Sequence, residues 1–116
     1  MKSSEFQAWF DLVAHLPRET GIYSVWSSDK LLYIGTSDCL RDRLRMHIRR
    51  REFVALRADI IRYFLLDDKN DLRLRSQRYE MERFLIRRNR PLLNVMAKDG
   101  WYPLIGKTGY DGVMVQ

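Results

Sequence analysis

The sequence has one cysteine, few lysines and no long apolar stretch. The lone Cys39 excludes an intramolecular disulfide and a cysteine-based metal cluster, so nothing in the chain requires an oxidising compartment. No apolar run approaches the roughly 18 residues that suggest a membrane-spanning helix. Acidic and polar groups also interrupt residues 1–10, where a signal peptide would need a continuous apolar segment. These absences lead us to expect a cytoplasmic protein.

Positive charge is abundant, and arginine carries most of it. The 116 residues include 21 Lys plus Arg against 15 Asp plus Glu, a formal charge of +6, and arginine outnumbers lysine by 16 to 5. Guanidinium groups match phosphate oxygens in a planar fork that ammonium groups lack. A polyanion is therefore the expected partner, and DNA is the one we favour.

Thirteen of the arginines lie on or beside two expected helices. Any one of them could simply belong to a solvated helix face, but the clustering favours phosphate contact. The candidates for binding nucleic acid are Arg41, Arg45, Arg49, Arg50, Arg87 and Arg88.

Length and hydrophobic periodicity predict one domain, 1–116, with its core over residues 20–95. In chain order we expect a helix over 4–16, a hairpin with strands 21–26 and 31–35, a helix from Ser37 or Asp38 to about Arg51, a strand over 60–66, a helix over 72–89 and an irregular tail over 96–116. Leu40, Leu44 and Ile48 recur every four residues and predict the buried stripe of the second helix. This order favours a small sheet covered by helices.

A set of polar residues and glycines stands out because packing alone would not place these residue types at these positions. The set consists of Gly21-Ile22-Tyr23, Tyr33-Ile34-Gly35, Arg43, His47, Glu82 and Asn94. With these motifs the chain resembles the GIY-YIG nuclease family from about residue 21 to residue 94. Both name-giving tripeptides are complete, and Arg43, Glu82 and Asn94 follow at the family's intervals, with Pro91 before the asparagine.

The resemblance implies an α+β fold, a three-stranded antiparallel sheet flanked by helices, and a metal-dependent endonuclease that hydrolyses DNA phosphodiester bonds. It implies that Glu82 binds one Mg²⁺ or Mn²⁺ ion, a hard cation that prefers carboxylate oxygen. Arg43 would neutralise charge on the phosphate. Tyr23 or Tyr33 would orient or deprotonate the attacking water, and the sequence does not choose between them.

Two positions depart from the commonest family pattern. Thr36 follows the second tripeptide, where many members have lysine, so the charge that would lower a tyrosine pKa must come from elsewhere. This departure supports the alternative of a DNA-binding module with weakened catalysis. His47 stands where many members have tyrosine, and its ordinary pKa near neutrality suits a general base or a phosphate ligand.

Each residue of this set also has an ordinary structural explanation. Tyr23 and Tyr33 could be packing residues of a sheet, and Glu82 could pair with Arg78 one helical turn earlier. Asn94 could turn the chain after a proline. These explanations account for single residues but not for their joint order.

The hairpin sets a geometric condition. Both tyrosines face one side of the sheet only if paired residue numbers add to an even value, and a four-residue SSDK loop gives an odd sum. We therefore predict an odd-length loop or a β-bulge near residues 27–31. The sequence shows no added DNA-reading motif, so the domain would either cut with little sequence preference or depend on a homodimer or an accessory partner. The aromatic tail residues are expected to pack rather than stack on bases.

Overall fold

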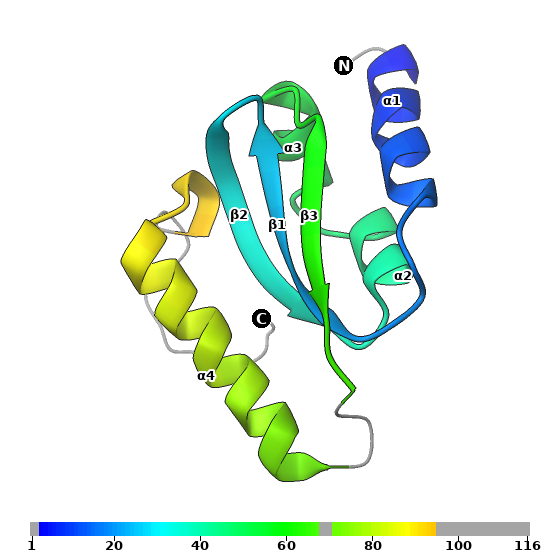
Figure 1. Ribbon diagram of the computed structural model, residues 1–116. Coiled ribbons are helices and arrows are strands. Elements are labelled where there is room, and N and C mark those ends of the chain that lie inside the picture. Colours follow the sequence, from blue (N-terminus) through cyan, green and yellow to red (C-terminus); the bar gives the residue numbers. More distant parts are fainter. Residues whose placement is uncertain (1–2, 68–70, 95–116) are drawn as a thin grey trace.

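The computed structural model describes residues 3–67 and 71–94. Its elements, in chain order, are α1 (Ser3–Ala14), β1 (Gly21–Ser27), β2 (Lys30–Ser37), α2 (Leu40–Arg45), α3 (Arg50–Ala55), β3 (Ile60–Leu65) and α4 (Leu72–Asn89) (Figure 1). The expected tail over 96–116 lies outside the described residues.

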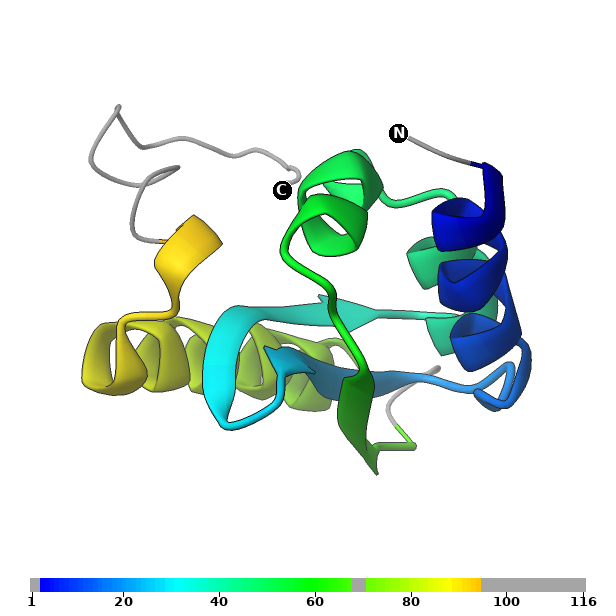
Figure 2. The same ribbon diagram turned by 90° about the horizontal axis from the view of Figure 1, so that it is seen from above.

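The three strands form one antiparallel sheet in the order β2-β1-β3, which confirms the expected fold class. Helices α1, α2 and α3 gather on one face of the sheet, whereas α4 runs alongside β2 (Figures 1 and 2). Within the two described ranges, no helix combines the length and apolar character that crossing a membrane would require. Strands β2 and β3 form the two edges of the sheet.

The β1–β2 hairpin contains the predicted bulge. Its loop is short, because β1 extends to Ser27 and β2 begins at Lys30. Trp26 pairs with Leu31 but Val25 pairs with Tyr33, and the register shift leaves one extra residue on β2. Beyond the bulge, the residue numbers of each pair of facing residues add to an even value. Both motif tyrosines therefore face the same side of the sheet.

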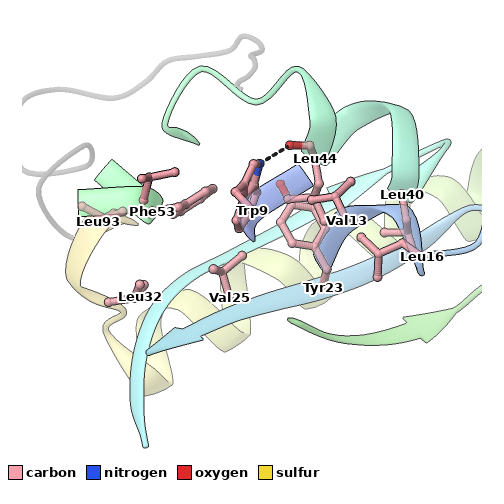
Figure 3. Packing of buried hydrophobic residues seen from close by; sticks show 11 residues of the cluster. Trp9, Val13, Leu16, Tyr23, Val25, Leu32, Leu40, Leu44, Phe53 and Leu93 are labelled. Atoms are coloured by element: carbon pink, nitrogen blue, oxygen red, sulfur yellow. Dashed lines mark hydrogen bonds between the residues drawn. The ribbon is translucent and has the colours of Figure 1, made fainter. Parts of the chain in front are cut away.

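The main core lies between the sheet and the first three helices. Trp9 and Val13 of α1 pack with Tyr23 and Val25 of β1, and the Trp9 indole donates to the Leu44 carbonyl at 3.3 Å (Figure 3). A smaller cluster joins α4 to the sheet through three buried isoleucines, namely Ile22, Ile34 and Ile86. The two clusters hold the sheet between helices on either side.

The second helix differs from the prediction. It ends at Arg45, and a separate helix α3 begins at Arg50. Leu40 and Leu44 are buried as expected, but Ile48 is 90% exposed, so the predicted stripe was wrong at that residue. The N-cap position is Cys39 rather than Ser37 or Asp38. After the break, the His47 side chain rather than that of Ile48 is buried in the protein.

Helix α4 matches its predicted bounds. The Asp71 carboxylate accepts hydrogen bonds from the Arg73 and Leu74 amides, which caps the first turn. The helix ends at Asn89. The C-cap residue, Arg90, has a φ of 45° in the left-handed region, and Pro91 prevents continuation of the helix. Glu82 lies near the middle of the helix between these two ends.

Candidate active site

Tyr23 lies directly across from Gly35, the last residue of the second tripeptide. A Cβ atom at Gly35 would lie 2.5 Å from the Tyr23 hydroxyl and 2.7 Å from its ring carbon. The glycine is therefore required because the phenol of the facing strand occupies the space of a side chain. The Tyr23 and Tyr33 rings stack with 6.2 Å between their centroids. The two tripeptides thus build one pair of phenols.

His47 closes one side of this tyrosine pair. Its ring centroid lies 4.9 Å from that of Tyr33 and 6.4 Å from that of Tyr23, both edge to face, and 5.1 Å from that of Phe53. The side chain is buried, with 5% exposure. Its position agrees with the sequence-based expectation that His47 lies beside the motif tyrosines.

The hydrogen bonding of His47 fixes its tautomer. Nδ1 accepts from the Arg49 backbone amide at 3.0 Å, so the proton of the neutral ring resides on Nε2. Burial, together with the nearby charges of Arg43 and Arg49, lowers the pKa of His47 to about 3. The expectation of a near-neutral pKa was wrong, because the ring lies in a dry, positively charged setting. A ring with a proton already on Nε2 is a hydrogen-bond donor rather than a general base.

Arg43 from α2 and Glu82 from α4 both act on the tyrosine pair. Arg43 hydrogen-bonds the Tyr23 hydroxyl, and its charge lowers the pKa of that phenol, whereas Glu82 raises it. Glu82 also raises the pKa of Tyr33, which Arg49 and Arg43 lower. The structure therefore brings side chains from α2 and α4 into electrostatic contact with both phenols.

Burial is the largest influence on both phenols. It raises the pKa of Tyr23 and of Tyr33 well above the ordinary value, and the nearby arginines offset only part of the effect. With the charges that this chain itself supplies, both phenols are neutral at pH 7. They can donate a hydrogen bond and accept one, but they are poor proton acceptors.

Asn94 completes the outer edge of β2. Its Oδ1 accepts from the Ile34 amide at 2.7 Å, and its Nδ2 donates to the Ile34 carbonyl at 3.0 Å. The side chain is buried and satisfies the backbone of an edge strand as a neighbouring strand would. Because both polar atoms of the Asn94 side chain bond to the Ile34 backbone, this geometry supports a role for Asn94 in positioning the adjacent Tyr33. Contact between Asn94 and substrate remains a sequence-based prediction.

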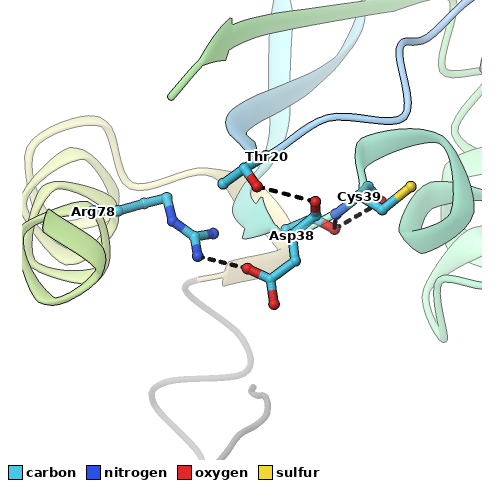
Figure 4. A network of polar contacts seen from close by, with 5 residues as sticks. Thr20, Asp38, Cys39 and Arg78 are labelled. Atoms are coloured by element: carbon cyan, nitrogen blue, oxygen red, sulfur yellow. Dashed lines mark hydrogen bonds and ion pairs between the residues drawn. The ribbon is translucent and has the colours of Figure 1, made fainter. Parts of the chain in front are cut away.

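A polar network attaches α4 to the turn that follows β2. Arg78, buried on α4, donates from Nη2 to Asp38 Oδ1 at 2.8 Å (Figure 4). The Asp38 carbonyl in turn accepts from Thr20 Oγ1 at 3.1 Å. Arg78 precedes Glu82 by one helical turn, so the pair fixes the part of α4 from which that carboxylate projects. Sequence reasoning placed Arg78 only as a local partner of Glu82 and missed the contact with Asp38.

The arginines predicted to bind nucleic acid differ in their surroundings. Arg45, Arg87 and Arg88 are exposed. Arg41 donates from Nε to the Leu16 carbonyl at 2.7 Å, which joins α2 to the end of the α1 segment. Arg49 and Arg50 are partly buried. Arg49 pairs with Glu52, and Arg50 donates to the Arg45 carbonyl. Phosphate contact by all six stays a prediction.

The donor set fits one hard cation. In residues 3–67 and 71–94 no three His, Cys, Asp or Glu side chains gather into a site that could hold a metal by themselves. Glu82 is the carboxylate near both phenols. Mg²⁺ is commonly held by one or two carboxylates, with water and substrate phosphate completing its shell. A single ion at Glu82 is compatible with these residues, whereas a zinc-type cluster is not.

The fold and the ordered motifs define a GIY-YIG domain, and comparisons with known proteins agree. No protein-family model matches the chain. It is 32% identical over 113 residues to the UvrABC system protein C of Natronomonas pharaonis, covering 89% of this chain and 18% of that protein. It is 34% identical over 116 residues to the same protein of Haloquadratum walsbyi, covering 95% and 18%. The chain thus spans about a fifth of the length of these relatives.

Solved structures show the same fold. The N-terminal GIY-YIG endonuclease domain of UvrC from Thermotoga maritima, bound to magnesium as its catalytic divalent cation, superposes with a TM-score of 0.56 at 21% identity. The match covers 81% of this chain and 99% of that domain. The chain therefore has the fold of the GIY-YIG domain, as the motifs predicted.

Proposed function

We propose that this chain is a metal-dependent endonuclease domain that hydrolyses phosphodiester bonds in DNA. The observation that carries the proposal is the convergence of Arg43 and Glu82 on the Tyr23 phenol from two different helices. Packing alone does not explain a cation and an anion beside a buried phenol. The names of the similar proteins, a component of the UvrABC system and an endonuclease domain with a catalytic cation, support the same function.

Phosphodiester hydrolysis needs an oriented water, compensation for charge on the phosphoryl oxygens and help for the leaving alkoxide. Arg43 binds a non-bridging phosphate oxygen and stabilises the charge that develops there. Tyr23 and Tyr33, both neutral, hold the water through their hydroxyls. His47 Nε2, buried and without a hydrogen-bond partner in the part of the chain that the structure describes, donates to the substrate.

Glu82 would hold one Mg²⁺ or Mn²⁺ ion. A divalent ion there supplies positive charge to the scissile phosphate and makes water more acidic. The protein's own contribution is to place the Glu82 carboxylate beside the phenols, which the attachment of α4 to Asp38 maintains.

Nicking of supercoiled plasmid DNA tests this function. We expect the parent chain to cut in Mg²⁺ or Mn²⁺ and not in EDTA. Glu82→Gln and Arg43→Ala should lower the rate by at least about 100-fold, as the loss of a transition-state contact does. The matched controls are Glu80→Gln on α4 and Arg18→Ala between α1 and β1, which change exposed charges outside the site and should retain most activity.

A different result would favour a DNA-binding module with weakened catalysis. Thr36 supports that alternative, because it is buried and supplies no cation beside Tyr33. Binding of DNA by the parent without cutting in any divalent metal would establish the module. Equal rates for the parent and Glu82→Gln would remove the role proposed for the carboxylate. Mass measurement on the DNA complex would show whether a homodimer forms.

A further inference from the structure

The segment between α2 and α3 exposes two large apolar side chains on either side of a buried one. Met46 is 73% exposed and Ile48 is 90% exposed, whereas His47 between them is 5% exposed. Single exposed apolar residues are common on protein surfaces. Here, however, both flank a residue that contacts the tyrosine pair. We refer to Met46 and Ile48 together as the apolar wedge.

Hydrogen bonds hold this segment on both sides. The Met46 amide donates to the Arg43 carbonyl at 3.2 Å, and the Arg50 amide donates to the His47 carbonyl at 3.1 Å. The Arg49 amide donates to His47 Nδ1 at 3.0 Å. The His47 ring is itself packed against Tyr33 and Phe53. The apolar wedge therefore has a fixed position relative to the candidate active site.

The surroundings of the apolar wedge are strongly basic. Residues 41–52 contain six arginines and two carboxylates, a balance of +4. A surface with apolar tips among guanidinium groups complements a partner with anionic edges and an apolar interior. Duplex DNA has this construction, and proteins that bend DNA insert Ile, Leu, Met or Phe between base steps while arginines contact the backbone.

We propose that the apolar wedge inserts between bases next to the phosphate that the site cleaves. The domain then binds best to DNA whose base stacking is already weak, such as a mismatch, a bubble or a junction with single strands, because less stacking must be broken there. This inference rests on the proposed function, since it takes DNA as the substrate. It adds the structural class of DNA that the site selects.

Base unstacking can be measured without cleavage. The full chain carrying Glu82→Gln is titrated with duplexes that contain 2-aminopurine beside a mismatch or in a matched sequence. We expect 2-aminopurine fluorescence to rise on binding and the mismatched duplex to bind more tightly. Adding Met46→Ser and Ile48→Ser should abolish the rise and reduce the preference for the mismatch by at least about tenfold.

The matched control is Leu72→Ser with Met81→Ser, which removes two apolar side chains that are 79% and 47% exposed on α4. It should leave both the fluorescence rise and the preference unchanged. A rise that survives loss of the apolar wedge, or an equal loss in the control, overturns the inference. The inference is also overturned if the variant with Met46→Ser and Ile48→Ser changes only the self-association of the chain, as measured by sedimentation. Unstacking by a chain whose parent form never cuts DNA would contradict the proposed function while leaving this inference intact.

Discussion

Arg78 of α4 and Asp38 of the turn after β2 form an ion pair with 2.8 Å between Nη2 and Oδ1. The arginine side chain is fully buried, whereas 73% of the aspartate side chain is exposed. One helical turn separates this anchor from Glu82. The distance between the carboxylate and the phenols therefore depends on a contact that lies outside the name-giving motifs.

Removing this anchor should weaken both the fold and the site. Asp38→Ala takes away the carboxylate that a buried guanidinium contacts, so we expect a loss of about 1–3 kcal/mol in the free energy of unfolding. The control is Asp42→Ala, since Asp42 and Arg18 form a 3.7 Å pair in which both side chains are mostly exposed. Its effect should stay below about 1 kcal/mol. Urea denaturation compares the two, and equal losses would contradict the anchoring role.

Asn94→Asp tests the completion of β2. The substitution keeps the size of the side chain but replaces the donor to the Ile34 carbonyl with an acceptor. We expect a loss of about 1–3 kcal/mol in stability and faster hydrogen exchange at the Ile34 amide. Asn89→Asp is the matched control, because Asn89 donates to the Leu85 carbonyl at 2.9 Å in an exposed place. Unchanged exchange at Ile34 in the Asn94 variant would refute the edge-strand role.

Gly35→Ala should displace the Tyr23 phenol, because the added Cβ would lie 2.5 Å from the hydroxyl oxygen. We expect a stability loss of about 1–3 kcal/mol from overpacking, together with loss of plasmid nicking. Tyr23→Phe should reduce that stability loss, because it removes the nearest clashing atom. Gly21→Ala is the control: its Cβ would meet the Phe64 carbonyl, so Tyr23→Phe should not relieve it. A double-mutant cycle by thermal unfolding measures both couplings.

Acid should destabilise the fold through His47. Its pKa is about 3 in the folded chain against an ordinary 6.5, so between these values the unfolded chain binds the proton and the folded chain does not. This contribution to stability is complete above about pH 6.5 and is lost as the pH falls towards about 3, with a slope of up to about 1.4 kcal/mol per pH unit.

Comparing urea denaturation of two histidine variants across this pH range isolates the effect. Arg43, Arg49, Tyr23 and Tyr33 lie near the His47 ring, and the raised pKa of each tyrosine keeps both phenols neutral between about pH 3 and 6.5. His47→Gln should flatten the pH dependence, whereas His15→Gln, at the exposed histidine directly after α1, should not. An unaltered slope in the His47 variant would mean that the ring is not protonated on unfolding.

Much of the fold could be predicted from local patterns. The bounds of α4 followed from a long helical pattern that Pro91 terminates, and the hairpin from two β-prone segments around a turn. The bulge followed from the count of residues in the hairpin loop, once both tyrosines were required on one face of the sheet. The break after Arg45 could not be predicted, because Leu40, Leu44 and Ile48 have perfect helical spacing. The break places the His47 ring against Tyr33 and Phe53, and these contacts are tertiary rather than local.

The sequence by itself determined most of the elements, apart from the break between α2 and α3, and which chemical groups the family motifs supply. These depend on periodicity, glycine and proline positions, and residue type, all of which are local. The tertiary structure decided the protonation of those groups and their supports: the tautomer of His47, the raised pKa of the tyrosines, the Arg78–Asp38 anchor and the two bonds from Asn94 to Ile34. Burial and contacts between residues 40 or 60 positions apart set these properties, and a linear pattern does not contain them.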